Sequence, residues 1–308
     1  MSPPPDGAEI VVLGSANMDV VMEVPRLPRP GETLPGRRSG LFPGGKGANQ
    51  AVGAARLGAD VAFCGKVGED AFGETLLAGL RAAGVDTSAV AIDNGPATGV
   101  ACILVTPAGE NAIALSPGAN GRVDKGYAEG VLERIAAARI LLLQLEIPIA
   151  TVGHLLRRLP LKRPIVILDP SPATNLSALP LARIDILTPN RGELETLAGC
   201  SDPKVGGRRL IAQGVSNVIC KAGADGAYWI CEGRAVHLPA IPIVPVDTTG
   251  AGDAFNAALA WGLCSMSIGG ALPWAVAAGA LASTQRGAQP SFPTGEALAA
   301  FREEIAAG

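Results

Sequence analysis

The chain of 308 residues contains few of the side chains on which metal and nucleophile sites commonly depend. It has only two histidines, His154 and His237, which lie far apart and show no metal-ligand spacing. His154 falls in a helix-like segment, 151–159, where we expect a surface or structural role. A zinc site and a Ser-His-Asp triad are therefore poorly supported.

The cysteines also lack the pattern of a metal or redox motif, because no two of them form a C-x-x-C pair. Most of them lie in segments that are typical of apolar strands or helices. We therefore expect buried free thiols, which fit a protein of the reducing cytoplasm. The six are Cys64, Cys102, Cys200, Cys220, Cys231 and Cys264.

Neither sign of charge is in large excess, and no apolar run is long. Lys plus Arg number 25 and Asp plus Glu 28, so the net charge of −3 argues against a nucleic-acid surface held by bulk charge. Gly, Pro or a charge interrupts every apolar run well before a membrane span is reached, so no membrane partner is expected. The Pro-rich start, residues 1–8, is expected to be a disordered tail. It lacks the basic end and apolar core of a signal peptide.

What the chain does contain is glycine, at 40 residues, and one stretch with two of them, 246–255, is central to its organisation. The apolar run at 241–246 predicts a strand end and the small-residue segment at 254–263 predicts a buried helix. Backbone N–H groups at a helix N-terminus favour anions, and Gly250 and Gly252 allow a ligand to approach closely. Asp253 lies inside this turn. Two interpretations stay open for it: a helix cap, or a general base that activates a nucleophile attacking the bound anion.

A second glycine cluster, at 43–53, resembles a phosphate-binding P-loop but does not match it. Gly47 stands where the motif needs Ser or Thr to hold a metal ion, and no clear strand precedes the cluster. The remaining interpretation is a Gly-Gly turn that opens a helix at 48–57, with Lys46 and Asn49 near its start. These side chains are suited to the hydroxyl groups of a polar ligand. The dinucleotide pattern G-x-G-x-x-G also fails, because position 255 is Phe.

Short apolar runs alternate with helical segments along most of the chain, which predicts a doubly wound, mainly parallel sheet flanked by helices, in one large α/β domain over 1–308. The expected strands are 10–13, 61–68, 140–145, 165–168, 184–187 and 218–220. Right-handed crossovers bring the carboxyl ends of parallel strands to one edge. Side chains expected to line a crevice there, with the 246–255 stretch, are Asn17, Asp19, Glu146, Asp169, Asn190 and Lys221.

Two segments are expected to stand off the main sheet, at about 17–42 and 97–117. Within the second, apolar runs at 99–105 and 111–115 flank a turn at 107–110, which is a hairpin signal. Together the segments predict a small β-sheet over the mouth of the domain. Such a sheet is a candidate lid, and its exposed face or edge is a candidate homodimer contact.

Two motifs in this order resemble the signatures of the ribokinase-like (PfkB) carbohydrate kinases. Asp247-Thr248-Thr249-Gly250-Ala251-Gly252-Asp253 is similar to the C-terminal signature, and Gly44-Gly45-Lys46-Gly47-Ala48-Asn49-Gln50-Ala51 to the N-terminal one. The likeness runs from about residue 9 to the C-terminus and includes 287–291. It implies ATP-dependent phosphorylation of the CH₂OH group of a sugar, with Mg²⁺ and a potassium-type ion as cofactors.

The resemblance also implies roles for individual residues. Asp253 would be the general base, and Gly250, Ala251 and Gly252 would form the anion hole. Sugar contacts would come from Asn17, Asp19, Gly44, Gly45, Lys46, Asn49, Glu146 and Asp253. ATP contacts would come from Asn190, Lys221, Ala222, Gly223, Ala224, Asp225, Gly226, Gly252 and Val276. Asn190 and Glu193 would be linked to Mg²⁺, and the monovalent ion would be held by Asp247, Thr249, Ala282, Gln285, Gly287 and Ser291.

Two positions depart from the family pattern. Arg191 follows Asn190 where an acidic residue is usual, and Val276 stands near the expected adenine site where a polar residue is common. The form of the N-terminal signature, with Asn17 and Asp19, favours D-ribose as the acceptor. The alternatives are another pentose, deoxyribose, a nucleoside or a hexose. A non-catalytic sugar or nucleotide sensor is disfavoured because Asp253 is retained, and a dinucleotide oxidoreductase because its fingerprint is missing.

Overall fold

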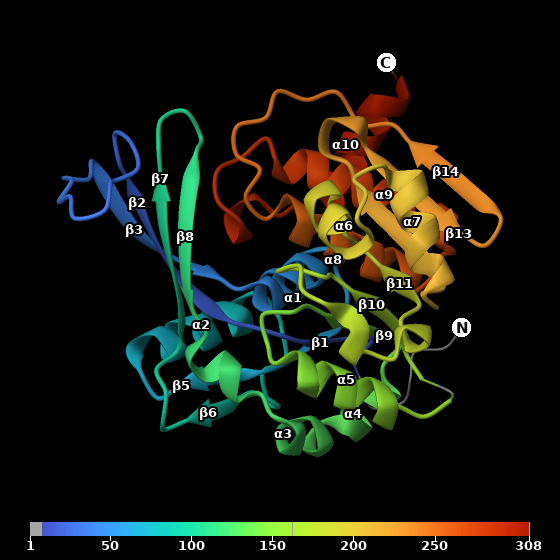
Figure 1. The fold of residues 1–308 in the computed structure, drawn as a ribbon, viewed down its shortest axis with the longest axis horizontal. Helices are drawn as coiled ribbons and strands as arrows, with labels where there is room; N and C mark the ends of the chain where they lie inside the picture. Colours follow the sequence, from blue (N-terminus) through green and yellow to red (C-terminus); the bar gives the residue numbers. More distant parts are fainter. Residues whose placement is uncertain (1–7, 162, 308) are drawn as a thin grey trace.

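The computed structural model describes residues 8–161 and 163–307, so most of the predicted N-terminal tail lies outside the described residues. Its centre is an eight-stranded sheet in the order β14-β13-β12-β11-β10-β9-β1-β4, with helices on both sides (Figure 1). Six neighbouring strands pair in parallel, and β13, next to the edge strand β14, pairs antiparallel with both β12 and β14. The strands are β1 (Ile10–Leu13), β4 (Val61–Cys64), β9 (Ile140–Leu143), β10 (Ile165–Leu168), β11 (Ile186–Leu187), β12 (Asn217–Lys221), β13 (Ala227–Cys231) and β14 (Arg234–Leu238). The predicted doubly wound sheet is thus confirmed.

The central strands are apolar on both faces because each face packs against helices. Along β1, Ile10 and Val12 belong to one core cluster, and Val11 and Leu13 to the other. The first cluster lies under α1 (Lys46–Arg56), α2 (Ala71–Ala82), α8 (Ala251–Leu263), α9 (Ile268–Ala282) and α10 (Gly295–Ala307). The second lies under α3 (Lys125–Gly130), α4 (Leu132–Ala137), α5 (Ile149–Arg158), α6 (Arg191–Ala198) and α7 (Pro203–Ala212). Short 3-10 helices are η1 (Gly118–Arg122), η2 (Leu176–Ala178), η3 (Leu181–Arg183), η4 (Gly223–Asp225) and η5 (Gln289–Ser291).

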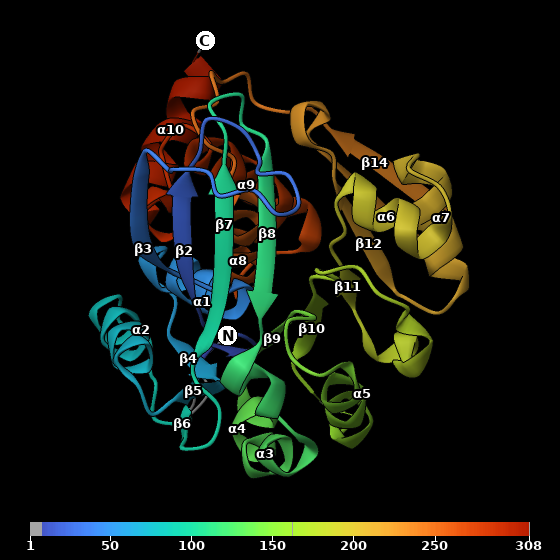
Figure 2. The same ribbon diagram turned by 60° about the vertical axis from the view of Figure 1, so that its left-hand side comes forward.

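A separate four-stranded sheet stands beside this body, in the order β3-β2-β7-β8 (Figure 2). Its strands are β2 (Asn17–Glu23), β3 (Arg38–Gly44), β7 (Gly99–Val105) and β8 (Asn111–Ser116). The predicted hairpin is confirmed as the antiparallel pair β7–β8. The predicted strand at 61–68 is divided in two: β4 joins the main sheet, whereas β5 (Lys66–Gly68) pairs with β6 (Ala91–Asp93) in a two-stranded sheet.

The expectation of a strand before the central glycine stretch is wrong. Residues 241–246 form no strand, and Val244 and Val246 are 84% and 57% exposed. Pro242 and Pro245 explain the difference, because proline has no N–H to donate to a ladder. The helix that follows does form, since α8 begins at Ala251.

The cysteines are also less buried than expected. Only Cys64 and Cys220 are buried, Cys102 is exposed, and the other three are half-buried; all six are free thiols. Cys102 is exposed in β7 of the small sheet, outside the main sheet that the helices cover. Within the described residues, no helix is both long and apolar enough to span a membrane.

Helices α1 and α8 approach each other closely, at positions with small side chains. A Cβ atom on Gly53 would lie 2.8 Å from the Cβ of Ala257, which is closer than two carbon atoms pack. Gly53 is one turn after Asn49 in α1, and Ala257 is one turn after Asp253 in α8. The chain's richness in glycine and alanine therefore brings these two helices together directly below two predicted site residues.

Candidate active site

Asp253 lies at the base of a polar cluster between α1 and α8. Its side chain is buried, with the residue 5% exposed, and it accepts hydrogen bonds from Asn49 Nδ2 at 3.0 Å and Gln50 Nε2 at 3.1 Å. Gln289 Nε2 in turn donates to Asn49 Oδ1 at 3.1 Å. Asn49 therefore presents its amide nitrogen, not its oxygen, to Asp253.

The geometry does not support the helix-cap interpretation of Asp253. The N-cap of α8 is Gly250, with φ of 77°, and no side chain caps this end. Both carboxylate oxygens of Asp253 instead face amides of α1. Burial raises the pKa of Asp253, and the nearby Asp169 raises it further, while Lys46 and the two amides act in the opposite direction. A buried carboxylate with a raised pKa is a better proton acceptor than an ordinary surface aspartate.

A second cluster surrounds Glu146, three residues after the end of β9. Its Oε2 accepts from the Ser15 hydroxyl, from Lys46 N at 3.1 Å and from Asn17 Nδ2 at 3.4 Å. Asn120 orients Asn17, because its Nδ2 donates to Asn17 Oδ1 at 2.7 Å while its Oδ1 accepts from the Ala16 N–H. Glu146 and Asn17 are thus brought together as predicted.

Ser15 and Asn120 were missed by the sequence analysis. Ser15 follows β1 closely and could have been found as a further polar residue at the carboxyl edge of the sheet. Asn120 lies in η1, far from any motif, and the sequence carries no signal for it.

Asp19 and Lys46 carry charges of opposite sign toward these clusters. Burial raises the pKa of Asp19 to about 7, and the negative charges of Glu146 and Asp253 add to this effect. Burial disfavours the charged form of Lys46, but the carboxylates of Asp253, Asp169 and Glu146 outweigh it and raise the pKa of its amine. Lys46 is therefore a cation among several acidic groups.

The ends of β10 and β12 are joined by an ion pair between Asp169 Oδ1 and Lys221 Nζ, 3.0 Å apart. The amine of Lys221 lies beside the start of α8, since a Cβ on Gly252 would be 3.5 Å from it. The first N–H groups of α8, at Ala251 and Gly252, belong to a helix terminus that attracts negative charge. This end of the crevice therefore combines a helix N-terminus with an amine, which is suited to phosphate.

Two loops meet on the far side of Gly250. Asp247 Oδ1 accepts from Thr249 N and its Oδ2 from Gly287 N, both at 2.9 Å, and Val246 N donates to Ser283 O at 2.8 Å. Burial would raise the pKa of Asp247, but these hydrogen bonds and Arg286 lower it overall. The residues predicted from the resemblance to hold a monovalent ion thus fall on adjoining loops, with Ala282 ending α9 and Ser291 ending η5.

Asn190 and Glu193 form a reciprocal cap at the start of α6. Asn190 Oδ1 accepts from Glu193 N at 2.8 Å, and Glu193 Oε2 accepts from Asn190 N at 2.7 Å. Arg191 forms an ion pair with Asp225, which lies in the 222–226 turn after β12. Val276 is buried in α9 at 8% exposure. His154, outside the crevice, contacts Glu129 Oε1 at 2.7 Å, in keeping with the structural role expected for it.

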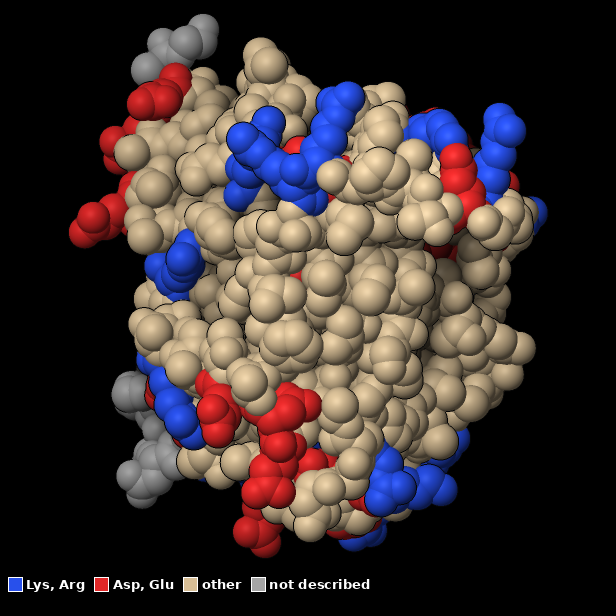
Figure 3. All heavy atoms as spheres, turned by 90° about the vertical axis from the view of Figure 1, so that its left-hand side faces the viewer, with Lys and Arg blue, Asp and Glu red and all other residues tan. Residues whose placement is uncertain are grey.

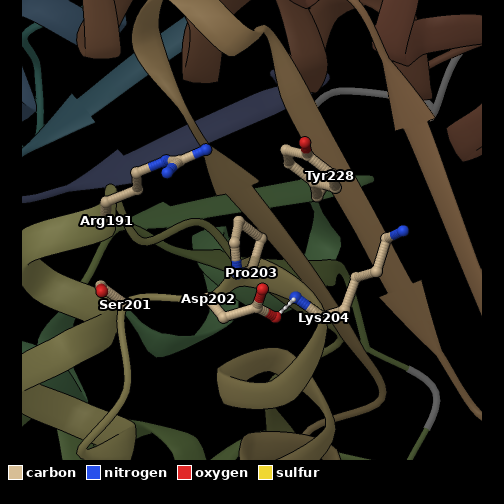
Figure 4. Close-up of a pocket in the computed structure, with 6 residues that line it drawn as sticks. All are labelled: Arg191, Ser201, Asp202, Pro203, Lys204 and Tyr228. Atoms are coloured by element: carbon tan, nitrogen blue, oxygen red, sulfur yellow. Dashed lines mark hydrogen bonds between the residues drawn. The ribbon is translucent and has the colours of Figure 1, made fainter.

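A cavity of about 370 Å³ lies between the starts of α6 and α7 and strand β13, and Arg191, which pairs with Asp225, forms part of its wall (Figure 4). It is lined by Arg191, Ser201, Asp202, Pro203, Lys204 and Tyr228. None of the predicted site residues lines it. Nor do the described residues contain a group of three or more His, Cys, Asp or Glu side chains that could hold a metal ion.

Comparison with known proteins agrees with this geometry. The sequence profile of the pfkB family carbohydrate kinases matches residues 8–295. The chain therefore belongs to the pfkB family of carbohydrate kinases.

Individual relatives carry more specific names. A ribokinase of Haemophilus influenzae is 37% identical over 301 residues, covering 96% of this chain and 98% of that protein. A deoxyribokinase of Salmonella typhi is 33% identical over 293 residues, covering 93% of this chain and 96% of that protein. The structure of Arabidopsis thaliana ribokinase complexed with ribose and ATP superposes with a TM-score of 0.88 at 34% identity, covering 96% of this chain and 98% of that one.

Proposed function

We propose that the chain transfers the γ-phosphoryl group of ATP to the primary hydroxyl of D-ribose, giving ribose 5-phosphate. The observation that carries the proposal is the buried Asp253 carboxylate, directed at α1 from the first turn of α8, where a helix N-terminus is ready for an anion. The similarity to proteins named ribokinase, one of them complexed with ribose and ATP, supports D-ribose as the acceptor.

In the proposed mechanism, Asp253 accepts the proton of the sugar hydroxyl as its oxygen attacks the γ-phosphorus atom. General-base catalysis of this kind contributes roughly 10²–10⁴-fold to the rate. The N–H groups of Gly250, Ala251 and Gly252 stabilise negative charge on the transferring phosphoryl group, and such electrostatic stabilisation is a main source of catalysis in phosphoryl transfer. In an in-line displacement, the ribose oxygen forms a bond to the γ-phosphorus atom while the bond from that atom to the bridging oxygen of ADP breaks, and ADP leaves.

The sugar hydroxyls are assigned to the two polar clusters. Carboxylates accept from hydroxyl groups and amide or ammonium groups donate to them, so both hydrogen-bonding roles of a hydroxyl are met. The assigned residues are Asn17, Asp19, Gly44, Gly45, Lys46, Asn49 and Glu146. ATP is assigned to Asn190, to the turn from Lys221 to Gly226, and to Val276.

Two cofactors accompany this proposal. Mg²⁺ bound with ATP supplies positive charge that neutralises the phosphates, and Asn190 and Glu193 are its proposed contacts. Asn190 Oδ1 and Glu193 Oε2 already accept hydrogen bonds at the start of α6, and oxygen groups of this kind would hold a hard cation such as Mg²⁺. The loops of Asp247 and Gly287 offer carboxylate, hydroxyl and carbonyl oxygens, a donor set that fits a hard monovalent cation, with Thr249, Ala282, Gln285 and Ser291 as the other proposed ligands.

The four-stranded sheet is proposed as the lid of the site and as a homodimer contact. By register, Asp19, Phe42, Ala101 and Leu115 lie on one face of this sheet, so the face with the proposed sugar ligand also carries apolar side chains. Phe42 and Leu115 are 45% and 42% exposed, and closure or a second copy of the chain would cover them. Figure 3 shows the side of the molecule on which the sheet stands, with a broad central area in which very few charged side chains reach the surface.

A deoxyribose kinase is the second candidate, favoured by the relative of that name. The difference between the two sugars is one hydroxyl group, and a site that hydrogen-bonds it rejects an acceptor without it. We also propose a reducing cytoplasm as the location, on the basis of the free thiols of all six cysteines.

The test is a coupled ADP-release assay over D-ribose, 2-deoxyribose, other pentoses, a hexose and a nucleoside, with Mg²⁺ and K⁺ present. We expect D-ribose to give the highest kcat/KM. A higher value for 2-deoxyribose would transfer the assignment to the second candidate. Tight sugar binding without turnover of any acceptor would refute both and favour a sensor.

A further inference from the structure

The network below Asp253 contains an amide that the mechanism above does not use. Gln50 is fully buried in α1, and its Nε2 donates to Asp253 Oδ1 and to Asp169 Oδ2, both at 3.1 Å. Its Oε1 accepts from Gln144 Nε2 at 2.6 Å. An amide nitrogen carries two hydrogens, so each is used on a different carboxylate.

The ionised carboxylates of Asp253 and Asp169 determine which way this amide faces, because they can only accept from it. Were the Gln50 amide reversed, its oxygen would meet both of them. Both contacts are unfavourable, and burial leaves no water to relieve them, because Gln50 and Gln144 are each 0% exposed. The donor of Gln50 is therefore held toward Asp253.

The other end of the network reaches the phosphate side of the crevice. Asp169, which shares the Gln50 amide, pairs with Lys221 Nζ at 3.0 Å, and this amine lies next to Gly252 at the start of α8. One continuous chain of contacts thus joins Lys221, Asp169, Gln50 and Asp253, across the ends of β12 and β10 and the two helices that lie side by side (Figure 1).

We propose that Gln50 is a positioning residue for the phosphoryl-transfer reaction. It holds the Asp253 carboxylate in the orientation that accepts the proton of the acceptor hydroxyl. It also links that orientation to the Asp169–Lys221 pair beside the start of α8. The inference rests on the proposed role of Asp253. Gln50 lies inside the N-terminal signature, but the resemblance gave it no role; the two hydrogen bonds from its buried nitrogen give it one.

The charges around Asp253 give this role a measurable signature. The charged groups that face it are Lys46 from α1, Asp169 after β10 and Asp19 from β2. Burial and Asp169 raise the pKa of Asp253, whereas Lys46 and the hydrogen bond from Gln50 lower it. Loss of the Gln50 donor must then raise the pKa, and neutralisation of Asp169 must lower it.

The first experiment is a pH profile of kcat for Gln50→Met and Asp169→Asn, with Gln213→Met on the exposed end of α7 as the matched control. Asp253 must be ionised to accept a proton, so activity is lost as the pH falls through its pKa. We expect this acid limb to move to higher pH in Gln50→Met, to lower pH in Asp169→Asn and not at all in Gln213→Met. At neutral pH, kcat of Gln50→Met should fall roughly 10- to 100-fold, as for a misplaced catalytic group, with both KM values little changed.

A second variant, Gln50→Glu, keeps the shape of the side chain and serves if the methionine variant does not fold. A third carboxyl beside Asp253 should move the acid limb upward as well. The proposal is overturned if the limb stays in place in both variants. It is equally overturned if the loss of activity follows only a lower melting temperature or a higher KM.

A readout without turnover separates this inference from the function on which it rests. The carboxyl carbon of Asp253 can be titrated by ¹³C NMR in the unsubstituted protein and in Gln50→Met. An upward displacement of the titration supports the positioning contact, and an unmoved titration refutes it. If the titration moves but no acceptor is phosphorylated, the proposed kinase activity alone is refuted.

Discussion

Replacement of Asp253 by Asn tests the proposed base with almost no change in side-chain volume. Both oxygens of Asp253 accept hydrogen bonds, from Asn49 and from Gln50, so the new NH₂ group must face one of two donors. The variant loses one hydrogen bond and leaves a buried donor unpaired, which costs about 1–3 kcal/mol. It also no longer buries a carboxylate, and the saved desolvation offsets part of that cost. We therefore expect the variant to fold.

The loss in rate should be far larger than the loss in stability. An amide cannot accept the proton, so the roughly 10²–10⁴-fold contribution of a general base disappears. This corresponds to about 2.7–5.4 kcal/mol of the activation barrier at 1.36 kcal/mol per tenfold. Binding of sugar and ATP should largely persist, because most proposed contacts remain.

The assay combines kcat from coupled ADP release with ribose and ATP binding by calorimetry. Asp202→Asn is the matched control, since Asp202 is an exposed N-cap of α7 and lies outside the site. Its kcat should equal that of the unsubstituted chain. A kcat for Asp253→Asn within about tenfold of the unsubstituted value would refute the reasoning, because a general base typically contributes at least about 10²-fold.

Three further predictions concern the surroundings of this group. Burial raises the pKa of Asp19 to about 7, so its contribution to the free energy of unfolding is present in full below about pH 4 and is lost as the pH rises through 7. Between pH 4 and pH 8, the free energy of unfolding measured in urea melts should fall less for Asp19→Asn than for the unsubstituted chain, and the difference should be at most about 4 kcal/mol. The same fall in both proteins would contradict this prediction. K⁺ should activate turnover more than Na⁺, and Asp247→Ala should abolish the preference; equal rates in both salts, after removal of contaminating cations, would count against the ion site. Gly45→Ala should weaken sugar binding and cost about 1–3 kcal/mol in backbone strain at φ of 87°, because its Cβ would also meet Asn17 N at 2.6 Å. Gly58→Ala is the matched control, because Gly58 has φ of 93° but open space around it, and this variant should show the backbone strain alone. Equal sugar affinity in the two variants would exclude the contact with Asn17 as the cause of weaker binding.

Much of this architecture could be predicted, because apolar runs are visible in the local sequence and the rules of chain connection restrict how the resulting strands are arranged. Four apolar runs end in Glu146, Asp169, Asn190 and Lys221, and parallel strands must bring those ends to one edge. The strand expected at 241–246 failed for a local reason, the two prolines. An apolar run can suggest a strand even where its prolines leave the backbone without the N–H groups that a strand needs.

The supporting amides were beyond the reach of the sequence because their partners are distant in the chain. Gln50 is 203 residues from Asp253, and Asn120 is 103 residues from Asn17. Nothing in the residues that flank Asn120 or Gln144 indicates which buried group each will meet. Such contacts follow from how elements pack, and only the three-dimensional structure supplies that.

The close approach of Gly53 to Ala257 has a consequence for mutational scans of this chain. The contact lies one turn below the hydrogen bond from Asn49 to Asp253, so a methyl group there acts as a wedge between the two helices that carry it. A screen for folded protein would score Gly53→Ala as a packing defect, while a screen for turnover would score it as an active-site lesion. Both screens would detect the same separation of α1 from α8. The loss of activity in the second screen would measure how far apart Asn49 and Asp253 can be moved before proton transfer fails.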